Sequence, residues 1–129
     1  MNKHIFNTLV AGIGGVFTYI FGGWDTPIIV LLWFMGIDYI TGLLNAWLQC
    51  NLNSKKGYKG IAKKASILVV LIVAVLLDRL LNNGIWVFRT LVCYFYIANE
   101  GISILENCGK CGLPLPQKLI KSLEQLKNK

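Results

Sequence analysis

The residues with the most chemical potential in this sequence are charged side chains that stand inside long apolar stretches. Asp38 follows ten consecutive apolar or glycine residues, and Asp78, Arg89 and Glu100 stand in later stretches of the same kind. An ionised side chain within a bilayer costs at least ~2.5–3.5 kcal/mol, so it normally faces protein, water or an opposite charge. These residues are therefore candidates for ion pairs, for contacts between subunits or for the lining of a water-filled path.

One intramembrane ion pair is suggested by position. Asp78 stands toward the end of the third apolar stretch, and Arg89 stands about a turn and a half into the fourth, which starts on the same side. We therefore predict an Asp78–Arg89 pair between antiparallel helices. For Asp38 no opposite charge is expected at its depth. Asp38 is either a protonated carboxyl bonded to a neighbour or an ionised one that lines a wet space between subunits.

A polar stripe marks the end of the fourth apolar stretch. Asn99, Ser103 and Glu106 recur at spacings of four and three, which places them on one face of a helix, with Glu100 beside them. The stripe indicates either a water-facing lining or a helix that emerges into the cytoplasm. The candidate pore-lining or inter-subunit polar residues are Asp38, Asn99, Glu100, Ser103 and Glu106.

The composition is that of a membrane protein. Of the 129 residues, 55% are hydrophobic and 15% are charged, whereas soluble domains are roughly 45–50% apolar and ~25% charged. Four apolar stretches of spanning length, without the alternation of barrel strands, cover residues 5–23, 27–50, 61–81 and 84–105. We predict an all-α integral membrane protein with a single domain over residues 1–129. It forms a bundle of four transmembrane helices, or three if 84–105 does not cross.

The lysines predict the orientation. One cluster lies in the connection before residue 65, comprising Lys55, Lys56, Lys59, Lys63 and Lys64, and a second lies in the tail 108–129. The opposite connections carry no lysine or arginine, so the positive-inside rule places the basic loop, the tail and both termini in the cytoplasm. A three-span topology would place the amino terminus outside. The net charge of +7 favours contact with anionic lipid headgroups.

The two ends of the chain carry patterns that favour packing. Small residues recur every three or four positions in the first stretch and form one face of a helix: Thr8, Ala11, Gly12, Gly15, Thr18 and Gly22. Such a face lets helices approach closely, within one subunit or between subunits. In the tail, Leu119, Ile120, Leu123 and Leu126 share one side of a short amphipathic cytoplasmic helix. This helix would lie on the inner leaflet or pack against a neighbouring subunit.

Enzymatic function has no support in the residue pattern. The sequence lacks a Ser/His/Asp or Cys/His arrangement, and its one histidine, His4, is remote from Cys108 and Cys111. A structural zinc site needs four ligands, so these two cysteines are expected to be incidental thiols. The lysines lack the aromatic platforms of a nucleic-acid site. We expect no enzyme activity, no metal or other cofactor, and no nucleic-acid partner.

Three motifs resemble the toxin-secretion and phage-lysis holin family. They are DYITGLLNAWL, NSKKGYKGIAKKASILVVLIVAVLLD and YFYIANEGISILENCGKCGLPLPQKLIKSLEQL, and together they run from residue 38 to 126. Members of the family are small membrane proteins of phages that infect low-GC Gram-positive bacteria, and of clostridial toxin loci. Cys108 and Cys111 depart from the apolar or small residues expected at their positions.

The resemblance implies a homo-oligomer in the bacterial cytoplasmic membrane that opens lesions. Through these lesions a phage endolysin reaches the cell wall, or a large toxin leaves the cell. In that setting Asp38 would obtain its partner or its water from the assembly. Two alternatives stay open: an antiholin, which would be a regulator or partner of the lesion-forming protein, and a subunit of a small-solute channel or transporter.

Overall fold

A computed structural model describes residues 2–127, and within them every regular element is a helix. Five helices follow one another along the chain: α1 (Lys3–Phe21), α2 (Thr26–Leu48), α3 (Ser54–Leu81), α4 (Phe88–Lys110) and α5 (Gln117–Lys127). Three of them, α1, α2 and α3, are long and apolar enough to cross a membrane. The all-helical prediction is therefore confirmed, and the predicted fourth span, now α4, does not meet the same criterion.

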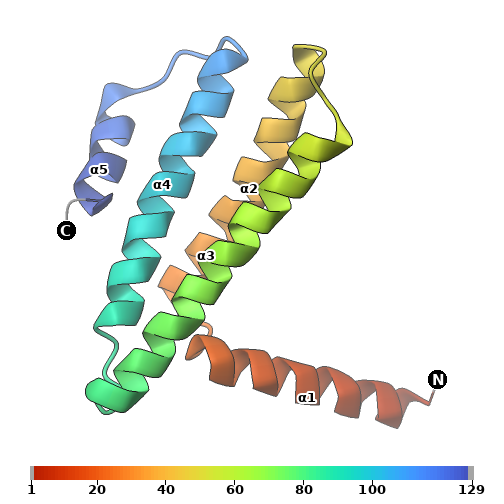
Figure 1. Ribbon diagram of the computed structural model, residues 1–129, viewed down its shortest axis with the longest axis vertical. Coiled ribbons are helices and arrows are strands. Elements are labelled where there is room, and N and C mark those ends of the chain that lie inside the picture. Colours follow the sequence, from red (N-terminus) through yellow and green to blue (C-terminus); the bar gives the residue numbers. More distant parts are fainter. Residues whose placement is uncertain (1, 128–129) are drawn as a thin grey trace.

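Helices α2, α3 and α4 pack lengthwise against one another, with α3 antiparallel to the other two (Figure 1). Their contact surface is a core of aliphatic and sulfur-containing side chains drawn from all three helices: Ile28, Leu31, Met35, Ile67, Leu71, Cys93 and Ile97. This core occupies the part of the bundle nearer the start of α2. It separates two groups of buried charges, one at each end of the apolar layer.

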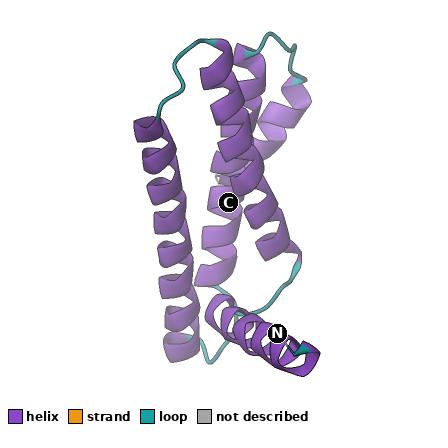
Figure 2. Ribbon diagram, turned by 90° about the vertical axis from the view of Figure 1, so that its right-hand side faces the viewer, coloured by secondary structure: helices purple, strands orange, loops and turns teal. Residues whose placement is uncertain are grey.

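Helix α1 lies outside this bundle and crosses its end (Figures 1 and 2). Of its residues only Phe21 is buried. Arginines from the bundle bind the carbonyl oxygens at its last turn: Arg79 donates to Tyr19 at 2.6 Å and Arg89 to Phe21 at 2.7 Å. The bundle therefore contains three helices, and the predicted bundle of four is not confirmed.

The small face of α1 has no neighbour over most of its length. A Cβ atom added at Gly12 or Gly15 would meet nothing within 4 Å, and Thr8 and Ala11 are exposed. Only the end of the face is in contact, where Thr18 accepts a hydrogen bond from Trp24 and Gly22 adjoins Arg89 and Trp86. The central small residues of α1 therefore do not pack against another helix of the same subunit. Their packing between subunits stays a prediction.

Helix α3 begins seven residues earlier than the predicted start at residue 61. Asn53 causes this early start, because its side chain accepts a hydrogen bond from the Lys56 amide at 2.9 Å and caps the helix. The lysines assigned to a cytoplasmic loop, Lys55, Lys56, Lys59, Lys63 and Lys64, therefore stand on the first turns of a long helix. Their side chains are directed by helical geometry, which brings Lys64 toward the bundle.

Helix α5 folds back alongside α4 in the opposite direction (Figure 1). Three of the four apolar residues predicted to share one face, Ile120, Leu123 and Leu126, are half-buried, whereas the fourth, Leu119, is exposed. Leu123 rests on Gly101 of α4, where an added Cβ would approach the Leu123 side chain to 2.9 Å. The amphipathic helix thus exists as predicted, but its apolar face is covered by its own subunit. The last two residues of the predicted tail lie outside the described part.

Candidate functional site

Three charged side chains, one from each helix of the bundle, meet in the half of the bundle nearer the end of α2. The ammonium of Lys64 on α3 lies 2.7 Å from Asp38 on α2 and 2.9 Å from Glu100 on α4. All three side chains are largely buried, with 15%, 14% and 6% of their surface exposed. The prediction that Asp38 has no opposite charge at its depth is therefore wrong. We call Asp38, Lys64 and Glu100 the inner triad.

Uncharged groups complete the coordination of Asp38. The Asn107 amide donates to the Asp38 carboxylate at 3.1 Å and to the Thr41 hydroxyl at 3.0 Å. The Thr41 hydroxyl in turn donates to the Ile37 carbonyl at 2.8 Å. A single subunit thus supplies both a cation and a hydrogen-bond donor to Asp38. Lys64 already stood inside the predicted stretch 61–81, and that position on a helix was the sequence signal for the pair.

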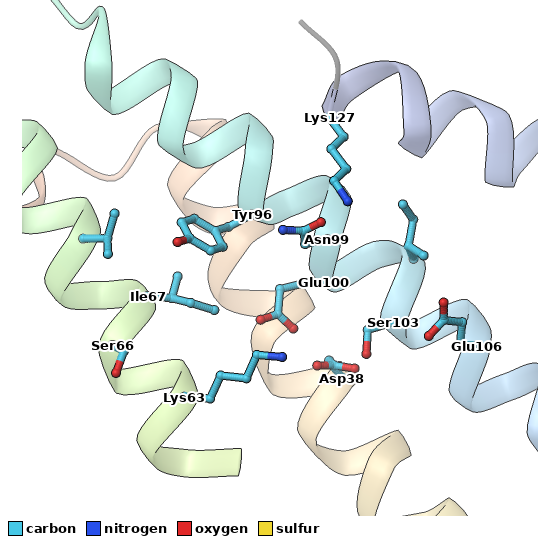
Figure 3. A pocket seen from close by; sticks show the side chains of 12 residues that line it. Asp38, Lys63, Ser66, Ile67, Tyr96, Asn99, Glu100, Ser103, Glu106 and Lys127 are labelled. Atoms are coloured by element: carbon cyan, nitrogen blue, oxygen red, sulfur yellow. The ribbon is translucent and has the colours of Figure 1, made fainter. Parts of the chain in front are cut away.

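A cavity of about 480 Å³ lies beside the triad, between α3 and α4 (Figure 3). All five residues of the predicted polar set line it: Asp38, Asn99, Glu100, Ser103 and Glu106. Lys63, Ser66 and Lys127 add polar groups, whereas Ile67, Val70 and Tyr96 form an apolar wall. The sequence therefore identified residues that share one space. That space lies within a subunit, so a role in lining a pore stays a prediction.

A second group of charges holds the opposite end of the bundle. The Arg89 guanidinium is 1% exposed and donates to both oxygens of Asp25, at 2.8 and 2.9 Å. The same group donates to the carbonyls of Phe21 and Gly23. Because Arg89 hydrogen-bonds to it, the pKa of the Asp25 carboxyl is held below its ordinary value. We call Asp25, Asp78 and Arg89 the outer cluster.

Asp78 and Arg89 are in contact, but not as the predicted side-chain ion pair. The Asp78 carboxylate accepts hydrogen bonds from the backbone amides of Phe88 and Arg89, at 2.9 and 2.8 Å. It thereby satisfies two of the amides that are left without partners at the start of α4. The guanidinium of Arg89 is engaged by Asp25, which the sequence reading did not single out. Asp78 is therefore a helix cap supplied by a neighbouring helix.

We expect the Asp78→Ala substitution to destabilise the protein by about 2–3 kcal/mol, because hydrogen bonds to a charged group are worth roughly 1.5–3 kcal/mol and two buried amides lose theirs. Unfolding by increasing SDS in mixed micelles would measure the loss. Asp78→Asn is the matched variant and should lose less, since its amide oxygen still accepts one bond. Equal losses for the two variants would show that the carboxylate does not act as a cap.

The cysteines and carboxylates of the described residues do not form a metal site. Within residues 2–127 no group of three or more His, Cys, Asp and Glu side chains is placed to hold a metal ion. The four cysteines are free, with Cys93 buried in the core and Cys108 and Cys111 near the end of α4.

Three apolar helices of spanning length, buried charges that join the helices and a partly open cavity with charged residues in its wall define a small helical membrane protein. The family model described as "Bacteriophage holin family" matches residues 15–128. The chain therefore belongs to the bacteriophage holin family, and the motifs from Asp38 onward identified it correctly.

Similar proteins occur in several Gram-positive bacteria. An uncharacterized protein of Clostridium acetobutylicum is 58% identical over 121 residues, which cover 94% of this chain and 97% of that protein. A protein of Clostridium perfringens described as an uncharacterized 14.9 kDa protein in the nagH 3' region is 57% identical over 93% of this chain and 91% of its own. The uncharacterized protein YtkC of Bacillus subtilis is 33% identical over 97% and 92%. No solved structure matches the chain.

Proposed function

We propose that this protein is a holin that assembles in the bacterial cytoplasmic membrane and opens lesions for an endolysin or a large toxin. The observation that carries the proposal is membership of the holin family over residues 15–128. The motifs resemble those of both toxin-locus and phage members, so we propose both an endolysin and a large toxin as candidate cargoes. The protein's own role is to open the path and not to modify the cargo.

The exposed surface of α1 supports assembly into oligomers. Large apolar side chains cover it, including Ile5, Phe6, Ile13 and Val16 at 55–60% exposure, and its central glycines have no neighbour. In lipid, helices associate through close packing of small faces, because no hydrophobic force drives them together. The α1 helices of neighbouring subunits are therefore the proposed contact. In the structure α1 runs across the end of the bundle (Figure 1), so its proposed crossing of the bilayer requires a rotation about the Gly22–Gly23 connection. Both termini lie in the cytoplasm if α4 crosses as well, as we propose.

The inner triad and outer cluster make α2, α3 and α4 a rigid unit that moves as one body during assembly. Lys64 bonds to both triad carboxylates, so one side chain of α3 ties α2 and α4 together. Asn99, Ser103 and Glu106 retain polar atoms toward the cavity. We propose that these three residues line the lesion. Asp38 and Glu100 instead stabilise the bundle of α2, α3 and α4.

A small-solute channel or transporter subunit is the second candidate. The observation in its favour is that a polar cavity of about 480 Å³ with charged walls exists within one subunit. A narrow path through single subunits would pass ions and not folded proteins. An antiholin would carry the same elements and keep the membrane closed.

The decisive experiment is expression of the full chain from an inducible promoter, with a potential-sensitive dye and an enzyme-sized cytoplasmic reporter followed in the same culture. A holin is expected to collapse the potential and release the reporter together after a lag. Loss of potential with the reporter retained would favour the channel. No change in either signal would contradict both and favour the antiholin.

Helix α1 offers a matched pair of variants for this assay. Gly15→Leu adds bulk to the centre of the small face, whereas Gly14→Leu adds the same bulk about 100° around the helix, at the edge of that face beside Thr18. Neither position has an atom within 4 Å of an added Cβ, so both subunits should fold normally. We expect Gly15→Leu to delay or abolish the onset and Gly14→Leu to leave it nearer wild type. Equal onset times would show that the small face is not the contact.

A further inference from the structure

Helix α5 is rich in lysine, yet it extends along the bundle toward the level of the middle of α2. Leu123 and Phe34 both contact the position of Gly101, so the middle of α5 lies at the level of Phe34. Phe34 is thirteen residues from Trp47 along α2, or ~20 Å at the rise of an α-helix. Trp24 and Trp47 stand just outside and just inside the two ends of α2, where tryptophan typically marks the membrane interfaces. Docked α5 therefore extends to about the middle of the bilayer.

The outward face of α5 is strongly polar at this depth. Lys118, Lys121, Glu124 and Lys127 are exposed, as is Leu119, while Ile120, Leu123 and Leu126 are half-buried. The covered face of α4 is polar too, since Asn99 and Glu106 share a cavity with Lys127 (Figure 3). Charged side chains at such depth are found where they face protein or water and not lipid. The flank formed by α4 and α5 therefore does not face lipid.

The other flanks of the bundle differ in kind. Exposed residues of α3 toward its outer end are aliphatic, among them Val69, Val73, Leu76 and Leu80. The large exposed residues of α2 are also apolar, among them Trp33, Ile40, Leu44 and Trp47. Near the start of α4 the exposed residues Leu91 and Phe95 are also apolar. Polarity at this depth is thus concentrated on the α4–α5 flank and on the turn of α3 that borders the same cavity, where Lys63 and Ser66 are exposed.

We propose that the α4–α5 flank faces a water-filled vestibule that opens to the cytoplasm, with the lysines of α5 as its inner lining. This inference rests on the proposed assembly and deepens it, because it assigns the surface that meets water. The α2 and α3 flanks face lipid. The vestibule is cationic, since α5 carries Lys118, Lys121 and Lys127 against one acidic residue, Glu124.

Cysteine accessibility in the reconstituted full chain tests the inference. Cys50, Cys108 and Cys111 are replaced by serine, and the fully buried Cys93 is kept. Lys121→Cys probes the vestibule, and Leu76→Cys, which is 55% exposed on α3, is the lipid-facing control. An impermeant anionic methanethiosulfonate should modify position 121 at least about tenfold faster than position 76, because a thiolate forms readily only in water. It should also change the ionic current only at position 121, by about half, since pore-lining charge controls conduction.

A third variant locates α5 during the reaction. Gly101→Leu places a side chain where Leu123 packs against α4 and should release α5 from α4. The reagent should then still modify position 121, but the modification should no longer change the ionic current. Failure to modify position 121 would place it in lipid and overturn the inference. Modification without a change of current in the docked protein would also overturn it. Absence of current before any reagent is added contradicts the proposed function itself, and the vestibule is then rejected with it.

Discussion

The Lys64→Met substitution is expected to destabilise this protein by about 3–5 kcal/mol, the usual consequence of removing one partner from a buried ion pair. Lys64 is the only cation within 4.0 Å of the Asp38 and Glu100 carboxylates in the described part of the chain. Without it, two carboxylates from α2 and α4 face one another in the bundle. Unfolding by SDS in mixed micelles, followed by helical circular dichroism, would measure the effect.

Two companion variants make this prediction specific. Lys63→Met removes an adjacent, exposed ammonium, and surface changes of this kind stay within about ±0.5 kcal/mol. The triple variant Asp38→Asn, Lys64→Met, Glu100→Gln removes every charge of the triad together and should regain most of the lost stability, because no unpaired charge remains. Equal destabilisation by Lys63→Met and Lys64→Met would show that the triad does not hold the helices.

The Arg89→Leu substitution is expected to release α1 from the end of the bundle and to cost about 2–4 kcal/mol, because each hydrogen bond to a charged group contributes roughly 1.5–3 kcal/mol and the freed carbonyls regain some water. Arg89 binds Asp25 and the carbonyls of Phe21 and Gly23 with three nitrogens. A lysine has one ammonium and does not span these partners, so Arg89→Lys should rescue little. Protease cleavage at the Gly22–Gly23 connection would report the release.

Arg79→Leu is the matched control for the arginine prediction. Arg79 donates to the Tyr19 carbonyl and lies over the Tyr19 ring at 4.2 Å, but it is not paired with a carboxylate in the described residues. Its loss should loosen only the last turn of α1 and increase cleavage less. If both variants were cleaved at the wild-type rate, neither arginine would hold α1.

Acid should weaken the same contact. The folded pKa of Asp25 is lowered, so the contribution of its pair with Arg89 is complete above the unfolded pKa of ~3.9. It is lost as the pH falls through the lower folded value. Asp25→Asn should remove this acid sensitivity. The Asp25 side chain is 47% exposed, so the solvent limits the size of the effect.

The sequence by itself determined the chemical class and the elements. Apolar stretches without alternation required helices in a membrane, and the spacing of Asn99, Ser103 and Glu106 placed them on one face, where they line one cavity. The motifs from residue 38 onward led to the holin family, which the match over residues 15–128 confirms. These properties depend on local composition and residue spacing, which the sequence gives directly.

The tertiary structure alone decided which charges meet. Lys64 is 26 residues from Asp38 and 36 from Glu100, and Arg89 is 64 residues from Asp25. Which residues pair over such distances along the chain depends on where each helix begins and ends and on how it is rotated. The Asn53 cap, for example, moves the start of α3 by about two turns. The position of α1 across the end of the bundle depends on hydrogen bonds from Arg79 and Arg89 to backbone carbonyl groups. A pattern of side chains along the sequence does not predict such bonds. The seat of α5 depends on the missing side chain of Gly101, whose role appears only when Leu123 is placed against it.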